Sequence, residues 1–176
     1  MAWNKISFKR AAKGSGRLKL KPEWSDRFTQ QEKTFEGMMR SFSEDALRGH
    51  PQSGKWGAFE HIAHLSHYQE ITLSRLADLI AGAPTTDVTP YRSEEDPEFL
   101  AWCQLATPAL LDRYHEARRA LINELSDIDP DKVIHVLVHP TYGKLDVQAL
   151  TEFFLHHEAH HLYQAYRLAL MSAKPA

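Results

Sequence analysis

Four long stretches of helical periodicity, separated by proline and glycine, constrain this chain more than any other feature of its sequence. In each stretch the apolar residues recur every three or four positions, which is the pattern of one buried helix face. The stretches predict helices over residues 22–48, 55–80, 108–125 and 147–172. Long amphipathic helices bury their apolar faces against one another, so the sequence predicts an all-α protein built as a four-helix bundle.

Capping and breaking residues mark the ends of these helices. The start signals, in chain order, are Pro22, Ser53, Thr107 with Pro108, and Asp146. Gly49 and Pro51 follow the first helix, and Gly82 begins a polar loop that is expected to end near Asp96. The boundaries of the helices are therefore predicted from local signals alone.

One segment departs from helical periodicity. Residues 128–146 are rich in β-branched side chains, namely Val133, Ile134, Val136 and Val138. A turn over residues 140–143 follows them. This composition predicts one or two short strands, or an extended crossover, immediately before the last helix.

Length and composition fit a single domain with short extensions. The chain has 176 residues, of which 43% are hydrophobic and 25% are charged, as in an ordinary globular protein. We expect a basic arm over residues 1–22, a bundle domain over 23–172 and a tail over 173–176. Cys103 is the only cysteine, which excludes an intramolecular disulfide and any zinc site of paired thiolates. No apolar run approaches the roughly 20 residues of a membrane span, so we expect a cytoplasmic protein without a membrane partner.

The charges are distributed unevenly along the chain. Residues 1–22 hold seven of the 21 basic residues and no acidic residue, so 14 basic residues accompany 23 acidic ones in the remainder. Such an arm packs against its own acidic domain, binds phosphate groups or serves as a transit peptide, and the first interpretation is the simplest. Only Trp3 and Phe8 are interleaved with the charges, which argues against a nucleic-acid partner.

Histidines on the last helix are the strongest functional signal. Of the 11 histidines in the chain, four lie there, as His156, His157, His160 and His161. At about 100° per residue, His157 and His161 share a sector about 80° wide with Leu150, Phe153 and Leu168. His156 and His160 share their side with polar residues instead. We therefore expect His157 and His161 to point into the bundle.

A third histidine is expected from the second helix. His64 shares a face with Glu60 and Tyr68, whereas His61 and His67 lie about 60° to either side. Imidazoles in an apolar stripe need partners, because an unpaired buried polar group costs roughly 1–3 kcal/mol. A metal ion bound by His64, His157 and His161 would satisfy them and leave one coordination position open. Hydrogen bonds to core tyrosines or to Glu60 are the alternative.

The last helix also contains a metalloprotease-like pattern. His157-Glu158-Ala159-His160-His161 reads H-E-x-x-H, in which the glutamate is the general base of a zinc protease. Zinc proteases of this type take a third ligand downstream, but no histidine, aspartate or glutamate follows His161. Glu158 also lies about 100° from the direction of His157. The protease is therefore the weaker alternative.

Three groups of residues occur in an order shared with a known family. They are Trp56 with Glu60 and His64–Leu65, the turn His139–Gly143, and the run His157–Gln164. In order and spacing they resemble the DinB/YfiT-like family of metal-dependent enzymes, whose fold is the DinB-like four-helix bundle. The resemblance extends over residues 23–172 and does not include the basic arm.

The resemblance implies a divalent ion, such as zinc, nickel or iron, held by His64, His157 and His161. Characterised relatives include thiol S-transferases that use low-molecular-weight thiols and a mycothiol-dependent isomerase, which implies a small-molecule substrate. An ion with three histidine ligands and an open position lowers the pKa of bound water or thiol, or polarises a carbonyl. We therefore expect transferase-like or hydrolase-like chemistry, with a non-catalytic metal-binding or partner-binding bundle as the alternative.

Further residues lie close to the expected ligands along the two helices. Glu60 and Gln164 are expected to support the ligands through hydrogen bonds. Glu60, His160 and Tyr68 are the candidate catalytic residues, as proton carriers or as the lining of a substrate pocket. Solvent contact for His160 and core packing for Tyr68 are equally simple explanations.

The first helix has more aromatic residues than one buried face requires. They are Trp24, Phe28, Phe35 and Phe42. A second apolar surface on this helix, together with the resemblance, predicts a homodimer with a self-complementary interface. A basic arm folded over that surface would instead leave a monomer.

Overall fold

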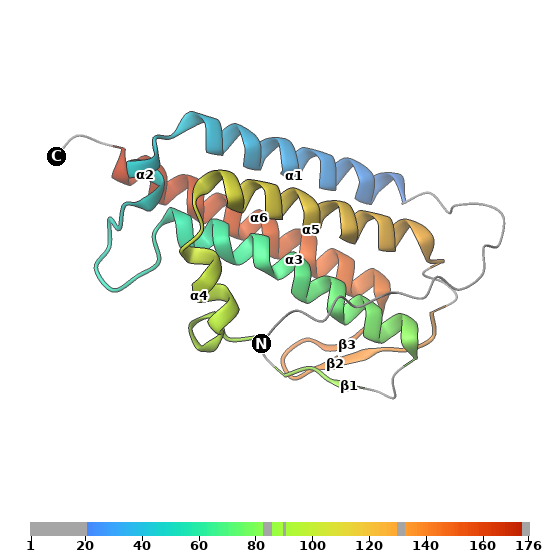
Figure 1. The fold of residues 1–176 in the computed structure, drawn as a ribbon. Helices are drawn as coiled ribbons and strands as arrows, with labels where there is room; N and C mark the ends of the chain where they lie inside the picture. The colour runs from blue at the N-terminus through green and yellow to red at the C-terminus, as the bar shows by residue number, and fades with distance from the viewer. Residues whose placement is uncertain (1–20, 83–85, 90, 130–132, 174–176) are drawn as a thin grey trace.

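Helices dominate the protein, and a small sheet lies at one end of them (Figure 1). The computed structural model describes residues 21–82, 86–89, 91–129 and 133–173. Nearly all of the basic arm and of the C-terminal tail therefore lies outside the described residues. The helices are α1 (Pro22–Ser41), α2 (Glu44–Arg48), α3 (Ala58–Ala81), α4 (Pro97–Cys103), α5 (Thr107–Asp127) and α6 (Val147–Ser172).

The four long helices, α1, α3, α5 and α6, lie side by side along a common direction (Figure 1). Short helices α2 and α4 connect them at one end, and the sheet covers the other end. The prediction of a four-helix bundle is confirmed. Within the described residues, no helix is both long and apolar enough to cross a membrane.

The first predicted helix is wrong in one respect, because it is two helices. Phe42 leaves the helical conformation, with φ −117° and ψ 147°. Ser43 then caps α2, since its hydroxyl accepts a hydrogen bond from the backbone N–H of Ala46. A serine cap inside an otherwise continuous apolar pattern was enough to restart the chain in a new direction.

Two of the other predicted start signals act differently from expectation. Ser53 does not cap the second long helix, which begins at Ala58, where the Glu60 carboxylate accepts a hydrogen bond of 3.0 Å from the Gly57 N–H. Thr107 lies inside α5 and its hydroxyl donates to Glu44 instead. Asp146 does cap α6, as predicted, by accepting from the N–H of Ala149.

The segment before the last helix is extended, as predicted, and forms part of a three-stranded sheet. Its strands are β1 (Thr86–Asp87), β2 (Leu137–His139) and β3 (Gly143–Leu145). β2 and β3 form an antiparallel hairpin in which His139 pairs with Gly143, and β1 joins β2 in parallel. Gly143 has φ 72°, a left-handed conformation that favours glycine at this turn. β1 comes from the segment predicted as a polar loop.

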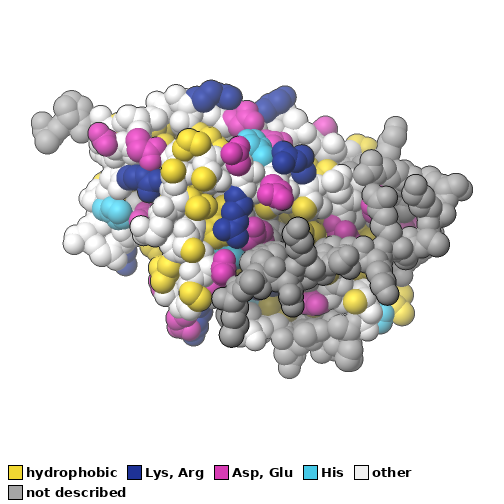
Figure 2. Space-filling view, viewed as in Figure 1, with side chains coloured by type: hydrophobic (Ala, Val, Ile, Leu, Met, Phe, Trp, Pro, Cys, Tyr) yellow, Lys and Arg dark blue, Asp and Glu magenta, His cyan; other side chains and the backbone are white. Residues whose placement is uncertain are grey.

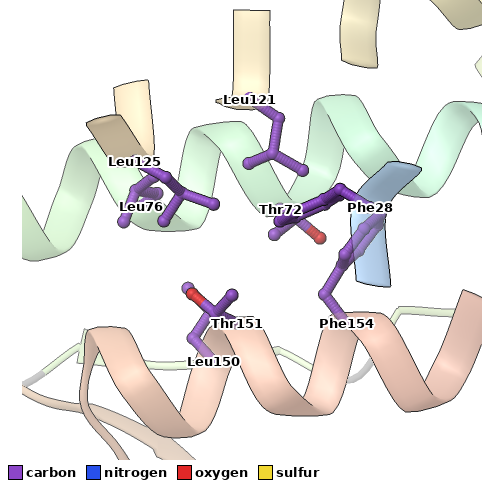
Figure 3. A pocket seen from close by; sticks show the side chains of 8 residues that line it. All are labelled: Phe28, Thr72, Leu76, Leu121, Leu125, Leu150, Thr151 and Phe154. Atoms are coloured by element: carbon purple, nitrogen blue, oxygen red, sulfur yellow. The ribbon is translucent and has the colours of Figure 1, made fainter. Parts of the chain in front are cut away.

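Apolar side chains form two hydrophobic clusters along the bundle. In the cluster nearer the sheet, eight side chains from all four long helices close around a space too small for a water molecule (Figure 3), and they are Phe28, Thr72, Leu76, Leu121, Leu125, Leu150, Thr151 and Phe154. The second cluster includes Phe35, Phe59 and Trp102. Buried polar side chains lie between the two clusters.

The aromatic residues of α1 do not form a second exposed surface. Trp24, Phe28 and Phe35 are at most 2% exposed and belong to the core. On the face shown in Figure 2, hydrophobic side chains are interspersed with acidic and basic ones. The largest exposed aromatic side chains on a helix are instead Tyr163 and Tyr166 of α6.

Candidate metal centre

Three histidines from two helices meet where α3 packs against α6. His64 comes from α3, and His157 and His161 come from α6. One ring nitrogen from each lies within 4.8 Å of the other two, and the Nε2 atoms of His64 and His157 are 3.1 Å apart. The structure therefore brings together the three residues that the helical periodicity singled out.

The geometry of these nitrogens fits a divalent ion. Zinc–imidazole bonds of about 2.0–2.1 Å in a tetrahedral arrangement place the ligand nitrogens about 3.3 Å apart. A small inward movement of the side chains would bring all three nitrogens to that spacing. The buried Nδ1 of His157 has no hydrogen-bond partner within the described residues, so the ring is not held there by a competing bond. Three imidazoles form a donor set suited to zinc, nickel or iron.

The imidazoles are held in the neutral form that binds metals. Burial, together with the charge of neighbouring imidazoles, lowers the pKa of His64 to about 3. Burial and the nearby His160 lower the pKa of His157 to about 4. The pKa of His161 is also lowered far below its usual range, by burial and by His64. At neutral pH each ring therefore has a free lone pair.

These lowered pKa values predict acid instability of the metal-free protein. The unfolded chain takes up protons near pH 6.5, whereas the folded His64 does so only near pH 3, so stability falls as the pH drops between these values. At pH 5, His64 alone should cost about 2 kcal/mol of unfolding free energy relative to pH 7. Urea unfolding of chelator-treated protein at both pH values measures this loss.

The matched controls for this prediction are two single variants. His64→Gln should show a smaller loss between pH 7 and pH 5, whereas His156→Gln, at an exposed position, should behave as the wild type. Identical pH dependence in all three proteins would contradict the prediction.

The Ser93 side chain contacts His64 at the ring nitrogen opposite the one that lies near His157. Ser93 opens the short 3₁₀ helix η1 (Ser93–Glu95), and its buried hydroxyl lies 2.8 Å from the His64 Nδ1. With Nδ1 engaged in this way, Nε2 faces the other histidines. No sequence pattern indicates this role for Ser93, because it lies in a segment predicted only as a polar loop.

We expect Ser93→Ala to weaken metal binding by about 10–100-fold without changing the number of ions bound, because outer hydrogen bonds orient metal ligands. Competition with a coloured chelator measures the affinity. Ser126→Ala is the control, since the Ser126 hydroxyl donates to the Ile122 carbonyl of its own helix, away from the histidines. Equal affinity in the two variants would show that Ser93 does not support the site.

A fourth imidazole joins the three. The Nδ1 of His61 lies 2.8 Å from the Nδ1 of His161, although helical periodicity placed His61 to one side. Burial lowers the pKa of His61 to about 4. The Trp56 ring lies 5.2 Å from the rings of both His61 and His64. Trp56 and His61 thus lie together on one side of the histidine cluster.

Two of the predicted neighbouring residues contact the cluster. The Tyr68 ring lies 4.1 Å from the His157 ring, and its hydroxyl accepts a hydrogen bond from Arg75. Burial raises the pKa of Tyr68, so its hydroxyl stays protonated at neutral pH. The exposed His160 packs its ring 5.1 Å from that of His161. Their catalytic roles stay predictions.

The other two predicted neighbours have partners away from the histidine nitrogens. One carboxylate oxygen of Glu60 accepts from Gly57, and the other lies 2.8 Å from the His50 Nε2. The Gln164 carbonyl accepts hydrogen bonds from Arg167. Glu60 thus shapes the start of α3, and Gln164 orients an arginine on its own helix.

Glu158 lies in a separate polar group on another side of α6. Its carboxylate is fully buried and accepts hydrogen bonds from Arg118 and from the Tyr114 hydroxyl. The Arg118 guanidinium is also buried. Because the Glu158 carboxylate pairs with Arg118, it is not available as a general base at the histidines. The protease alternative therefore loses its chemical basis.

Comparison with known proteins places this bundle in a family. A model of the DinB superfamily matches residues 27–165, a stretch that contains all three clustered histidines. The chain belongs to the DinB superfamily. The predicted family resemblance is thus confirmed. A comparison with curated proteins found no match.

A solved structure supports the fold of this DinB-superfamily chain. The crystal structure of TT2238, described as a four-helix bundle protein, aligns with a TM-score of 0.60 and 22% sequence identity. The alignment covers 80% of this chain and 94% of that chain. At this identity the likeness shows the shared fold alone.

Proposed function

We propose that this DinB-superfamily protein is a metal-dependent enzyme that acts on a small molecule. The observation that carries the proposal is the convergence of His64, His157 and His161 between α3 and α6, with one ring nitrogen of each within 4.8 Å of the other two. Transfer of a small thiol to an electrophile is the favoured reaction, and hydrolysis of a small molecule is the second.

Open space beside the histidines supports catalysis over a structural role. A pocket of about 460 Å³ includes His61, which contacts His161, and the size suits a small-molecule site. A second one, of about 570 Å³, is lined by Tyr91, whose ring lies 5.8 Å from that of His64. Within the described residues, three histidines have ring nitrogens that all lie within 4.8 Å of one another, and His61, although close to His161, is not part of that group; structural zinc sites are closed by four ligands.

The residues beside the three histidines would each support the chemistry of a bound ion in a different way. A divalent ion with three imidazole ligands lowers the pKa of a bound water or thiol. His64 is oriented by Ser93, and Trp56 packs its ring against those of His64 and Phe99. The Tyr68 ring packs against His157, and its protonated hydroxyl has a hydrogen that it could donate to developing negative charge.

The protonation state of the protein's only thiol supports a reaction in which the thiol comes from a separate molecule. Cys103 is the only cysteine in the chain, and burial raises its pKa to about 11. A protonated thiol is a poor nucleophile. A reaction that forms a bond to sulfur therefore requires a thiol brought by the substrate.

Elemental analysis of the purified protein, followed by thiol-transfer and hydrolase assays on protein loaded with zinc, nickel or iron, tests the proposal. We expect one ion per chain and turnover in the thiol-transfer assay. One ion without turnover in either assay would support a non-catalytic metal-binding bundle. The absence of a bound ion would favour a partner-binding module.

The homodimer stays a proposal, with a different surface as its basis. An apolar groove of about 460 Å³ runs between α1 and α6 and includes Met38, Leu162, Tyr163 and Tyr166. Pairing of two such grooves would cover the exposed tyrosines. Light scattering tests this, and a mass near 20.2 kDa, that of one chain, would contradict it.

A further inference from the structure

An arginine that forms no ion pair with the acidic residues in the described part of the chain lines a pocket beside the histidine cluster. Arg167 follows His161 by six residues on α6, which is about 9 Å along the helix axis. The Arg167 side chain lines the same pocket as His61, which contacts His161. None of the ion pairs among the described residues includes Arg167.

Gln164 holds this guanidinium in place. Its side-chain oxygen accepts hydrogen bonds from Arg167 Nε at 3.3 Å and Nη2 at 3.0 Å. Among the residues that the structure describes, the remaining nitrogen, Nη1, has the Met171 sulfur as its hydrogen-bond partner, at 3.7 Å. The guanidinium is therefore oriented by a neutral amide, and it has more N–H donors than these contacts use.

The arginine lines a pocket that also includes His61, the imidazole beside the three candidate ligands. This pocket is lined by Gln52, Gly54, Lys55, Trp56, His61, Glu94, Arg167 and Leu168. It has two cationic side chains and one acidic side chain, and Lys55 and Glu94 are both exposed. His61 connects it to the cluster through its contact with His161.

The chemistry of the lining defines what the pocket would recognise. A guanidinium presents two parallel N–H donors that match the two oxygens of a carboxylate. Trp56 and Leu168 offer apolar surface for a short carbon chain. A ligand with a carboxylate at one end would thus reach towards the histidines with its other end.

We propose that Arg167 binds the carboxylate of the substrate, so that the thiol used by this protein is a small thiol that also carries a carboxylate. The inference rests on the proposed function, because the sulfur end of such a molecule is directed to the ion held by His64, His157 and His161. Gln164 is the positioning residue for Arg167.

Two thiols that differ in the carboxylate test the proposal. Cobalt-loaded protein is titrated with 3-mercaptopropionate and with 2-mercaptoethanol, and the thiolate-to-metal absorption band reports coordination of sulfur. We expect 3-mercaptopropionate to bind about tenfold more tightly, the difference that one charge-assisted hydrogen bond makes. Arg167→Gln should remove this preference and leave the cobalt content unchanged.

Arg119→Gln is the matched control. Arg119 is exposed on α5 and is absent from the lining of the pocket, so its loss should leave the tenfold preference intact. Equal binding of the two thiols by the wild type, or a preference that persists in Arg167→Gln, would overturn the proposal.

Propionate, a carboxylate without a thiol, distinguishes failure of the carboxylate-binding role of Arg167 from failure of the proposed thiol chemistry. Propionate should shift the NMR signal of the Arg167 Nε–H. If propionate shifts it but neither thiol produces the absorption band, the anion site stands and the thiol chemistry is wrong. If both thiols produce the band equally and propionate has no effect, the thiol chemistry stands and the role of Arg167 is wrong.

Discussion

Replacing His157 by alanine is expected to abolish stoichiometric metal binding, whereas replacing the adjacent His156 leaves it intact. His157 contributes a nitrogen 3.1 Å from that of His64, inside the bundle. The His156 side chain is 78% exposed and lies near Glu152 on the surface. Loss of a ligand should lower affinity by more than the 10–100-fold that loss of an outer hydrogen bond causes. Elemental analysis after dialysis measures the bound ion.

His64→Ala and His161→Ala extend the same test to the other two ligands. Each should behave as His157→Ala does, because three nitrogens are needed to hold one ion here. An equal loss in His156→Ala would show that the wrong side of α6 had been assigned. Retention of the ion in all three ligand variants would mean that the imidazoles are only a hydrogen-bonded core cluster.

Glu158→Leu is expected to lower the free energy of unfolding by about 3–5 kcal/mol, the usual cost of breaking a buried ion pair by removing one partner. The reason is Arg118, whose side chain is 1% exposed and would keep an uncompensated charge. Its Nε and Nη1 already have no hydrogen-bond partner within the described residues. Urea unfolding of metal-free protein at pH 7 measures the change.

The double variant Arg118→Met with Glu158→Leu is the control, since it removes both charges while keeping apolar volume. It should recover most of the lost stability. Both variants should still bind one ion when folded, because Glu158 faces Arg118 and not the histidines. A variant of Glu158 that folds normally but binds no ion would contradict this assignment.

The parts of the structure that follow from local signals were predictable from the sequence. Asp146 was identified as a cap because a carboxylate three residues before a free N–H is a local arrangement. Ser53 is also a residue type that caps helices, but it does not cap one here. The Glu60 carboxylate, within the first turn of α3, accepts the hydrogen bond from the Gly57 N–H instead. The pattern of glycine followed three residues later by glutamate was present and points to this alternative.

The candidate site likewise contains some residues that sequence patterns identify and others that they do not. His64, His157 and His161 were identified because each lies on the apolar face of a long helix, and helical periodicity fixes that face. Ser93 and Arg167 were not, because their positions depend on how a loop returns to α3 and how Gln164 orients a neighbouring side chain. Such tertiary contacts leave no periodic trace in one sequence.

The buried pair of Arg118 and Glu158 has a consequence for how the protein acquires metal. Glu158 follows His157 directly, so the ion pair that ties α6 to α5 also fixes the rotation of α6 about its axis. With the helix unable to turn, His157 and His161 are aimed before any ion arrives. Metal capture then costs little conformational entropy, unlike in zinc fingers, where the ion must fold the chain. The apo and loaded proteins should share one backbone, and a rigid coordination sphere of this kind selects among metals by geometry.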